Sequence, residues 1–293
     1  MSIFRGSGVA IVTPFKDDKS VDYKAFEKLL AFQMDNGTDA IVVCGTTGES
    51  STLTDKEHAK LVKLAAKAVA GQVPIIAGCG SNNTEHAIHL TKSAVANGAD
   101  AIMQVTPYYN KATQSGLVRH FTEIAKSTEL PIMLYNVPAR TSCNIEAKTV
   151  AKLSKIDNIV CIKEASGDIS QIAEIRKLCG KDFDIYSGND DQVVPLMSLG
   201  AVGVVSVVAN IAPRLMSYMC AEYLAGNVGK SLEIQLELLD LCKACFIELS
   251  PGPIKEALEM MGLGKANYRS PMGAISEESR KIVREVLERF GMV

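Results

Sequence analysis

The chain has 293 residues, 47% of them hydrophobic, and a formal net charge of -2. This length fits one large domain or two ordinary ones, and the near-neutral charge argues against nucleic acid or a membrane surface as the main partner. Apolar runs stay well short of the roughly 18 residues of a membrane span, and the N-terminal stretch lacks a signal peptide's apolar core and cleavage site, so we expect a cytoplasmic protein.

Short apolar runs alternate with helix-length amphipathic runs along most of the chain. Strands are expected at 8–12, 40–44, 74–77, 101–105, 132–135, 159–163, 184–187 and 203–207. Helices are expected at 23–36, 54–70, 83–97, 116–127, 146–154, 169–179, 190–199 and 213–225. The strands are unbroken apolar runs, which is typical of a parallel sheet covered on both faces.

Eight such units predict an α/β fold, a (β/α)8 TIM barrel over residues 1–225. The repeated pattern in "DNGTDAIVVC" and "ANGADAIMQV" supports it, because Asn-Gly ends a helix and Asp-Ala-Ile opens the next strand. A doubly wound sheet is the alternative, but no G-x-G-x-x-G follows the first strand. After residue 225 only helices are expected, at 227–249, 253–261 and 276–290, which predicts a small C-terminal all-helical domain over 226–293.

In barrels of this kind, the residues that end the strands form the active site. Lys163 ends the apolar run in "CIKEASGD". A lysine amine is a nucleophile only when unprotonated, and desolvation favours that form, so Lys163 suits Schiff-base formation with a carbonyl. Tyr135 ends the preceding strand and is suited to cover the lysine and carry protons. A snorkelling surface lysine and a core tyrosine are the ordinary alternatives, and both stay open at this point.

Two further strand ends carry groups suited to a carboxylate. Thr46 and Thr47 lie in "GTTGE", where hydroxyls and backbone N–H groups meet in one loop that lacks the lysine of a phosphate loop. Arg140, in "VPARTS", has the planar fork that matches a carboxylate. The alternatives are a tight turn that needs its glycines and a solvated loop cation. The adjacent Tyr108 and Tyr109 are more typical of an interface than of chemistry.

Cysteine and histidine usage predicts no disulfide framework and no metal site. The eight cysteines are scattered and several lie in apolar runs, as buried thiols of a reducing compartment do. Cys242 and Cys245 form a CxxC within a helical pattern, without a second Cys or His pair nearby. His86 and His89 share one helix face, but a metal needs three or four convergent ligands.

The motifs "GTTGES", "TPYYNK", "YNVPART" and "CIKEASGD" occur in this order, one at each of four strand ends. Together they resemble the pyruvate-dependent Schiff-base lyases of the N-acetylneuraminate lyase superfamily, and most closely its dihydrodipicolinate synthase family, over essentially the whole chain. The resemblance implies condensation of pyruvate with L-aspartate 4-semialdehyde to 4-hydroxy-tetrahydrodipicolinate, in lysine and diaminopimelate biosynthesis. It also implies a homotetramer built as a dimer of dimers.

The resemblance assigns a role to each strand-end residue. Lys163 would form the imine with pyruvate, which makes a separate cofactor unnecessary. The other roles concern proton transfer and substrate binding. Tyr135, Thr46 and Tyr109 would relay protons, with Tyr109 reaching in from a neighbouring subunit; Thr47 would hold the pyruvate carboxylate, Arg140 would bind the aldehyde substrate, and Gly188 and Val205 would line the pyruvate pocket.

Lysine-inhibited members of the family bind L-lysine at a dimer interface. The matching positions here are Ser50, Ser51, Asp55, His58, Asn82, His86 and Tyr108. His86 stands where those enzymes carry a glutamate that faces the cationic effector, and Asp55 stands where some carry a histidine. We therefore expect a degenerate pocket with weak or absent inhibition, in which Asp55 compensates in part.

Two other functions compete with this interpretation. Sialic acid lyases and sugar-acid aldolases share the lysine, the tyrosine and the "GxTGE" loop, but the sialic acid lyases generally lack the arginine after "YNxPA", which is Arg140 here. A non-catalytic barrel would keep the fold and lose the site, whereas all the expected residues are present. The synthase interpretation is therefore favoured.

Overall fold

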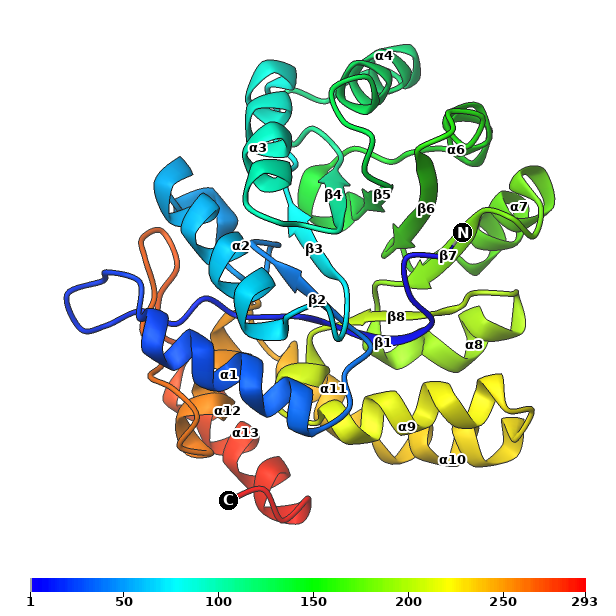
Figure 1. Ribbon diagram of the computed structural model, residues 1–293. Helices are drawn as coiled ribbons and strands as arrows, with labels where there is room; N and C mark the ends of the chain where they lie inside the picture. Colours follow the sequence, from blue (N-terminus) through cyan, green and yellow to red (C-terminus); the bar gives the residue numbers. More distant parts are fainter. Residues whose placement is uncertain (1) are drawn as a thin grey trace.

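A computed structural model describes residues 2–293 of the chain. Eight parallel strands close into a barrel in sequence order, with β1 paired to both β2 and β8, and the helices surround it (Figure 1). The strands are β1 Gly6–Ala10, β2 Ala40–Val43, β3 Ile75–Gly78, β4 Ala101–Val105, β5 Ile132–Asn136, β6 Ile159–Glu164, β7 Asp184–Ser187 and β8 Gly203–Ser206. All eight predicted strands are confirmed, and no strand end differs from its expected position by more than two residues.

The strands are buried on both faces, and alternate side chains enter two separate apolar clusters. Ala40 and Val42 of β2 point into the barrel interior, while Ile41 and Val43 pack outward against the helices. This alternation follows from the two-residue period of a strand, and it decides which face each strand-end residue presents.

The barrel helices follow the strands as expected. They are α1 Tyr23–Asp35, α2 Asp55–Val69, α3 Thr84–Ala96, α4 Gln114–Ala125, α6 Ala147–Leu153, α7 Ile169–Cys179, α8 Val193–Ser198 and α9 Pro213–Leu224. Gly37 and Gly98, after α1 and α3, have φ of 74° and 88°, which confirms the left-handed helix stops predicted from the repeated Asn-Gly. The sequence did not indicate the four-residue helix α5 Pro138–Thr141 or the short 3-10 turns η1 Ser50–Thr52 and η3 Val208–Asn210.

The expected helix at 190–199 is wrong in its first turn. A separate 3-10 turn, η2 Asp190–Gln192, precedes α8. The side chain of Asp190 explains the break, because its Oδ2 accepts hydrogen bonds from the backbone N–H groups of Val207 (3.0 Å) and Val208 (3.2 Å). The turn is therefore held against the loop after β8 and does not continue the helix.

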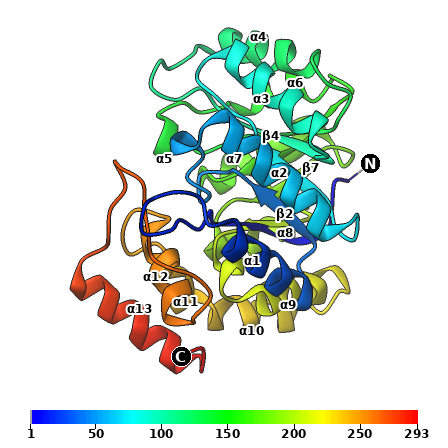
Figure 2. The same ribbon diagram turned by 60° about the vertical axis from the view of Figure 1, so that its left-hand side comes forward.

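Only helices follow α9, as predicted: α10 Val228–Glu237, α11 Leu239–Cys245, α12 Gly252–Met260 and α13 Glu277–Arg289 (Figure 2). The helix expected at 227–249 is divided at Leu238. α10 packs against α9, and the Ser231 hydroxyl donates to the Met219 carbonyl at 2.7 Å. The division of the chain into two domains at residue 225 stays a prediction. Among residues 2–293, no helix has the length and apolar character needed to span a membrane.

Candidate active site

Lys163 lies inside the barrel at the end of β6. Cys161 of the same strand belongs to the interior cluster, so the two-residue alternation directs Lys163 inward as well, and the residue is only 4% exposed. β5 and β6 pair Tyr135 directly with Lys163. The Lys163 Nζ atom lies 4.3 Å from the centroid of the Tyr135 ring. The lysine is therefore a buried amine covered by a phenol, and the surface alternative does not fit this position.

The space around Lys163 is closed by β7 and β8. A Cβ atom placed on Gly188, just after β7, would lie 3.1 Å from Lys163 Cε and 2.6 Å from the Ala165 Cβ, so glycine is needed there for close approach. Val205 of β8 is fully buried and belongs to the same interior cluster as Tyr135. The predicted pocket residues Gly188 and Val205 thus come from the two strands that follow Lys163 around the barrel.

Buried carboxyl groups flank the lysine strand, and the sequence had not pointed to them. Glu164 is fully buried on the outer face of β6, where it accepts hydrogen bonds from the Asn136 Nδ2 (3.1 Å and 3.0 Å) and the Ser166 N–H (2.8 Å). Burial raises the pKa of Glu164, and these hydrogen bonds lower it. Because Asn136 follows Tyr135, the Glu164–Asn136 contact holds the ends of β5 and β6 in register.

Burial also raises the pKa of Asp190, while hydrogen bonds with Ser206, Val208 and Val207 and, to a smaller extent, the Lys163 charge lower it. One carboxylate oxygen of Asp190 holds the loop after β8, and its Oδ1 has no hydrogen-bond partner. In the sequence, only the motif "GNDD" after β7 could have indicated Asp190.

The "GTTGES" segment folds as a tight turn after β2. The Gly48 N–H donates to the Gly45 carbonyl and the Glu49 N–H donates to the Thr46 carbonyl, both at 3.0 Å. Glu49 has a φ of 53°, in the left-handed region that non-glycine residues seldom adopt. Thr47 is buried, and Thr46 is half-buried at the edge of a cavity. The segment is therefore a tight turn that also presents two hydroxyls, so the two interpretations of the sequence are compatible.

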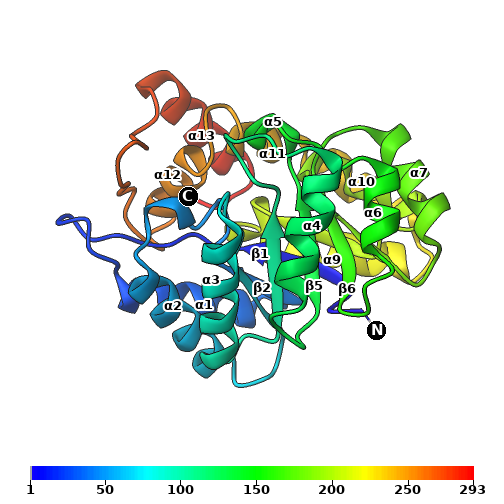
Figure 3. The ribbon, with the colours of Figure 1, turned by 90° about the horizontal axis from the view of Figure 1, so that it is seen from above.

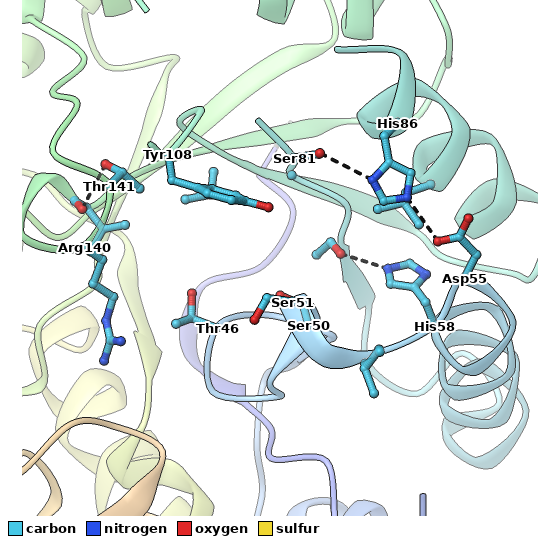
Figure 4. Close-up of a pocket in the computed structure, with 16 residues that line it drawn as sticks. Thr46, Ser50, Ser51, Asp55, His58, Ser81, His86, Tyr108, Arg140 and Thr141 are labelled. Carbon is cyan, nitrogen blue, oxygen red and sulfur yellow. Dashed lines mark hydrogen bonds and ion pairs between the residues drawn. The ribbon is translucent and has the colours of Figure 1, made fainter. Parts of the chain in front are cut away.

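That cavity has a volume of about 360 Å³, and Figure 4 shows the residues that line it. Thr46, Tyr108 and Arg140, which follow β2, β4 and β5, line one side of it. Arg140 is exposed, and its Nη2 donates to the Ser250 carbonyl at 3.2 Å, so the guanidinium is tied to the C-terminal helical region. A cation held at the rim of a cavity lined by hydroxyls is suited to bind a carboxylate.

Most of the positions expected for a degenerate effector pocket line the same cavity. Ser50, Ser51, Asp55, His58 and His86 all line the cavity that Thr46 and Arg140 line. Asn82 is not among the residues lining it; its carbonyl accepts a hydrogen bond from the Asn110 Nδ2 at 2.9 Å in a neighbouring depression.

The Asp55 carboxylate contacts two imidazoles. The His86 Nε2 lies 3.1 Å from Asp55 Oδ1, and the His89 Nε2 lies 3.3 Å from Asp55 Oδ2. The hydrogen bond with His86 is the main cause that lowers the pKa of Asp55. Asp55 therefore has both oxygens engaged and is a poor replacement for a free acidic group.

Tyr109 is placed differently from the other predicted residues. It is 90% exposed, with φ at 72°, and its ring projects from the loop after β4. Because its own chain does not bury it, this tyrosine is suited to contact another molecule.

The family model that matches this chain covers residues 3–290 and describes the dihydrodipicolinate synthetase family. The chain belongs to this family.

Relatives agree with this membership over their full length. A 4-hydroxy-tetrahydrodipicolinate synthase from Caldicellulosiruptor saccharolyticus is 51% identical, over 100% of this chain and 99% of the relative. The dihydrodipicolinate synthase of Thermotoga maritima has a TM-score of 0.98 and 43% identity, with 100% of both chains covered. A chloride-inhibited dihydrodipicolinate synthase from Acinetobacter baumannii, in complex with pyruvate, has a TM-score of 0.97 and 42% identity, with 99% of both chains covered.

The cysteines of this dihydrodipicolinate synthetase family member are all free thiols, and only Cys179 is not buried. Burial raises the pKa of the Cys242 and Cys245 thiols. Cys242 and Cys245 are therefore core residues that pack helix α11 against its neighbours. Over residues 2–293, no cluster of three or more His, Cys, Asp or Glu side chains is arranged to hold a metal.

Proposed function

We propose that this member of the dihydrodipicolinate synthetase family condenses pyruvate with L-aspartate 4-semialdehyde to give 4-hydroxy-tetrahydrodipicolinate. The observation that carries the proposal is the buried amine of Lys163, 4.3 Å from the centre of the Tyr135 ring, in a chain 51% identical to a protein named for this reaction. The product is a precursor of lysine and diaminopimelate.

The reaction needs no bound cofactor, because the Lys163 imine draws electrons from the pyruvate methyl group. The amine attacks the carbonyl carbon of pyruvate, and loss of water gives the imine. Loss of a methyl proton gives an enamine, whose carbon attacks the aldehyde and forms the carbon–carbon bond. The α-amino group of the aldehyde substrate then displaces Lys163, which closes the ring and releases the enzyme amine.

Each of these steps moves a proton, and Tyr135, Thr46 and Tyr109 are proposed to carry them. Tyr135 covers the amine, and Thr46 lies at the edge of the cavity. Because Tyr109 is 90% exposed in its own chain, it is proposed to complete the site of a neighbouring subunit in a homotetramer of two dimers.

Hybrid subunits test this arrangement. Mixtures of Tyr109→Phe and Lys163→Ala subunits should regain activity, since one site in a mixed dimer would then be intact. Verified hybrids without such recovery would contradict it.

Carboxylate binding is proposed to divide between two parts of the site. Thr47 lies in the turn after β2 and would hold the carboxylate of pyruvate, while Gly188 and Val205 leave room for it beside Lys163. Arg140, at the rim, would hold the carboxylate of the aldehyde substrate. This division places the smaller substrate deep and the second substrate near the opening.

Lysine is proposed to inhibit this enzyme weakly or not at all. His86 supplies no negative charge for a cationic effector, and Asp55 has both oxygens in contact with imidazoles. The cytoplasm is the proposed location, because the buried free cysteines suit a reducing compartment.

Turnover with defined substrates tests the proposed function. Purified protein should consume pyruvate and L-aspartate 4-semialdehyde together, and should leave N-acetylneuraminate uncleaved. Cleavage of N-acetylneuraminate in preference to condensation would assign the chain to a lyase of the same superfamily.

A further inference from the structure

A buried ion pair joins the C-terminal helical region to the turn that carries Thr46 and Thr47. Lys255 of α12 is 2% exposed and Glu49, at the end of the turn, is 3% exposed. The Lys255 Nζ donates to Glu49 Oε1, across 206 residues of sequence. In Figure 3 the C-terminal helices α11 to α13 lie towards the same end of the barrel as α5, which follows β5. Arg140 of α5 donates to the Ser250 carbonyl just before α12, so this region lies at the strand ends that carry the site.

The Lys255 amine is held on several sides. It donates to the Asn267 carbonyl at 2.8 Å, and it lies 4.2 Å from the Phe15 ring centroid and 5.5 Å from that of Tyr268. Burial lowers the pKa of Lys255 to about 8, against the attraction of Glu49. A buried ion pair is costly to desolvate and adds little stability over apolar packing. Stability alone therefore does not explain why this pair is present.

Glu49 links this pair to the catalytic turn. Its Oε2 accepts a hydrogen bond from the Arg269 backbone N–H at 3.2 Å, so both carboxylate oxygens are bound by the C-terminal region. The backbone N–H of Glu49 donates to the Thr46 carbonyl at 3.0 Å, and this hydrogen bond closes the turn. With φ at 53°, Glu49 sits in a conformation that persists only where its surroundings hold it.

We propose that Lys255 and Glu49 are positioning residues for pyruvate, which hold the Thr46–Thr47 turn in its binding geometry from the C-terminal helices. The inference rests on the proposed function, because it needs Thr46 and Thr47 to act on pyruvate. Lys255 touches no substrate and acts through Glu49. The C-terminal region thus helps to position the turn that binds pyruvate.

Three variants separate positioning from plain stabilisation. Lys255→Met leaves the Glu49 charge buried without its partner, whereas Glu49→Gln keeps the shape and most hydrogen-bonding capacity of the side chain. The double variant removes both charges, so that no buried charge is left without a partner. The matched control is Lys265→Met, since Lys265 lies in the same region but forms an exposed ion pair with Asp17.

The measurements are the KM for pyruvate, the KM for the aldehyde, the rate of borohydride-trapped adduct formation and the thermal midpoint. Glu49→Gln and the double variant should raise the pyruvate KM about 10-fold and slow trapping by about 10- to 100-fold, the effect of a displaced binding group. The aldehyde KM should change little. The double variant should recover the thermal midpoint lost in Lys255→Met without recovering the pyruvate KM, and Lys265→Met should match the wild type.

Amide hydrogen exchange supplies a readout that does not depend on activity. Exchange at residues 45–50 should accelerate in Glu49→Gln, because the Glu49 N–H would then be held less firmly. A folded Glu49→Gln or double variant with wild-type pyruvate KM and wild-type exchange would overturn the inference. If the wild type itself forms no pyruvate adduct, the proposed function fails and the positioning role fails with it.

Discussion

Replacement of Gly188 by alanine tests the geometry around Lys163 with a single added methyl group. Gly188 has no positive φ, so alanine imposes no backbone strain and acts through space alone. The new Cβ would lie 2.6 Å from the Ala165 Cβ, 3.1 Å from Lys163 Cε and 3.2 Å from the Glu164 carbonyl oxygen.

The size of the effect follows from these distances. Carbon atoms in contact normally lie about 3.5–4.0 Å apart, so the Ala165 contact must open by about 1 Å. Overpacking of this kind costs about 1–3 kcal/mol of folding free energy. A reacting group misplaced by about 1 Å costs about 100-fold in rate. We therefore expect Gly188→Ala to fold with reduced stability and to form the pyruvate adduct about 10- to 100-fold more slowly.

The assay is the rate of borohydride-trapped adduct formation at saturating pyruvate, together with the free energy of unfolding in urea. Gly229→Ala is the matched control, because nothing lies within 4 Å of its new Cβ in helix α10, and there alanine should stabilise by about 0.5–1 kcal/mol. Ala165→Gly in the Gly188→Ala background should restore part of the rate by removing the closest contact. A folded Gly188→Ala protein that traps pyruvate at the wild-type rate would refute this account of the pocket.

Three further predictions concern the rim, the acid limit and the effector pocket. Arg140→Ala should leave adduct formation with pyruvate nearly intact and raise the aldehyde KM by about 10- to 100-fold, the loss of about 1.5–3 kcal/mol from a charged hydrogen bond; collapse of adduct formation in a folded protein would argue against the assignment. Hydrogen bonds from Arg269 lower the pKa of Glu57 to about 2 from a usual value of 4.5, so its stabilisation of up to about 3 kcal/mol is present above pH 5 and is lost as the pH falls towards 2. In urea unfolding, Glu57→Gln should flatten this acid-side decline, and an unchanged slope would contradict it. Initial rates should show no inhibition by sub-millimolar lysine, and His86→Glu should increase sensitivity about 10- to 100-fold; clear sub-millimolar inhibition of the wild type would show that the pocket still works.

The sequence predicts the barrel well because each strand carries its own local signal. The unbroken apolar runs reflect burial on both faces, and the glycines after α1 and α3 reflect a conformation that other residues adopt only with strain. Lys163 was identifiable for the same reason, since a charged residue at the end of an apolar strand conflicts with its surroundings. The structure adds that Tyr135 pairs with it directly.

The remaining features depend on contacts between residues far apart in the chain. No local pattern around Glu49 or Lys255 predicts their ion pair, because 206 residues separate them. The break before α8 arises from the hydrogen bonds of Asp190 with the loop after β8, and the occupied Asp55 carboxylate arises from two histidines on another helix. Sequence periodicity describes single elements, and these features belong to the packing between elements.

Borohydride reduction in the presence of pyruvate, followed by peptide mapping, tests whether Lys163 is the residue that forms the Schiff base. We expect a reduced three-carbon adduct on Lys163 and no other lysine, and no adduct at all in a folded Lys163→Ala variant. An adduct on a different lysine, or an unmodified wild-type protein under conditions where the fold is intact, would contradict it.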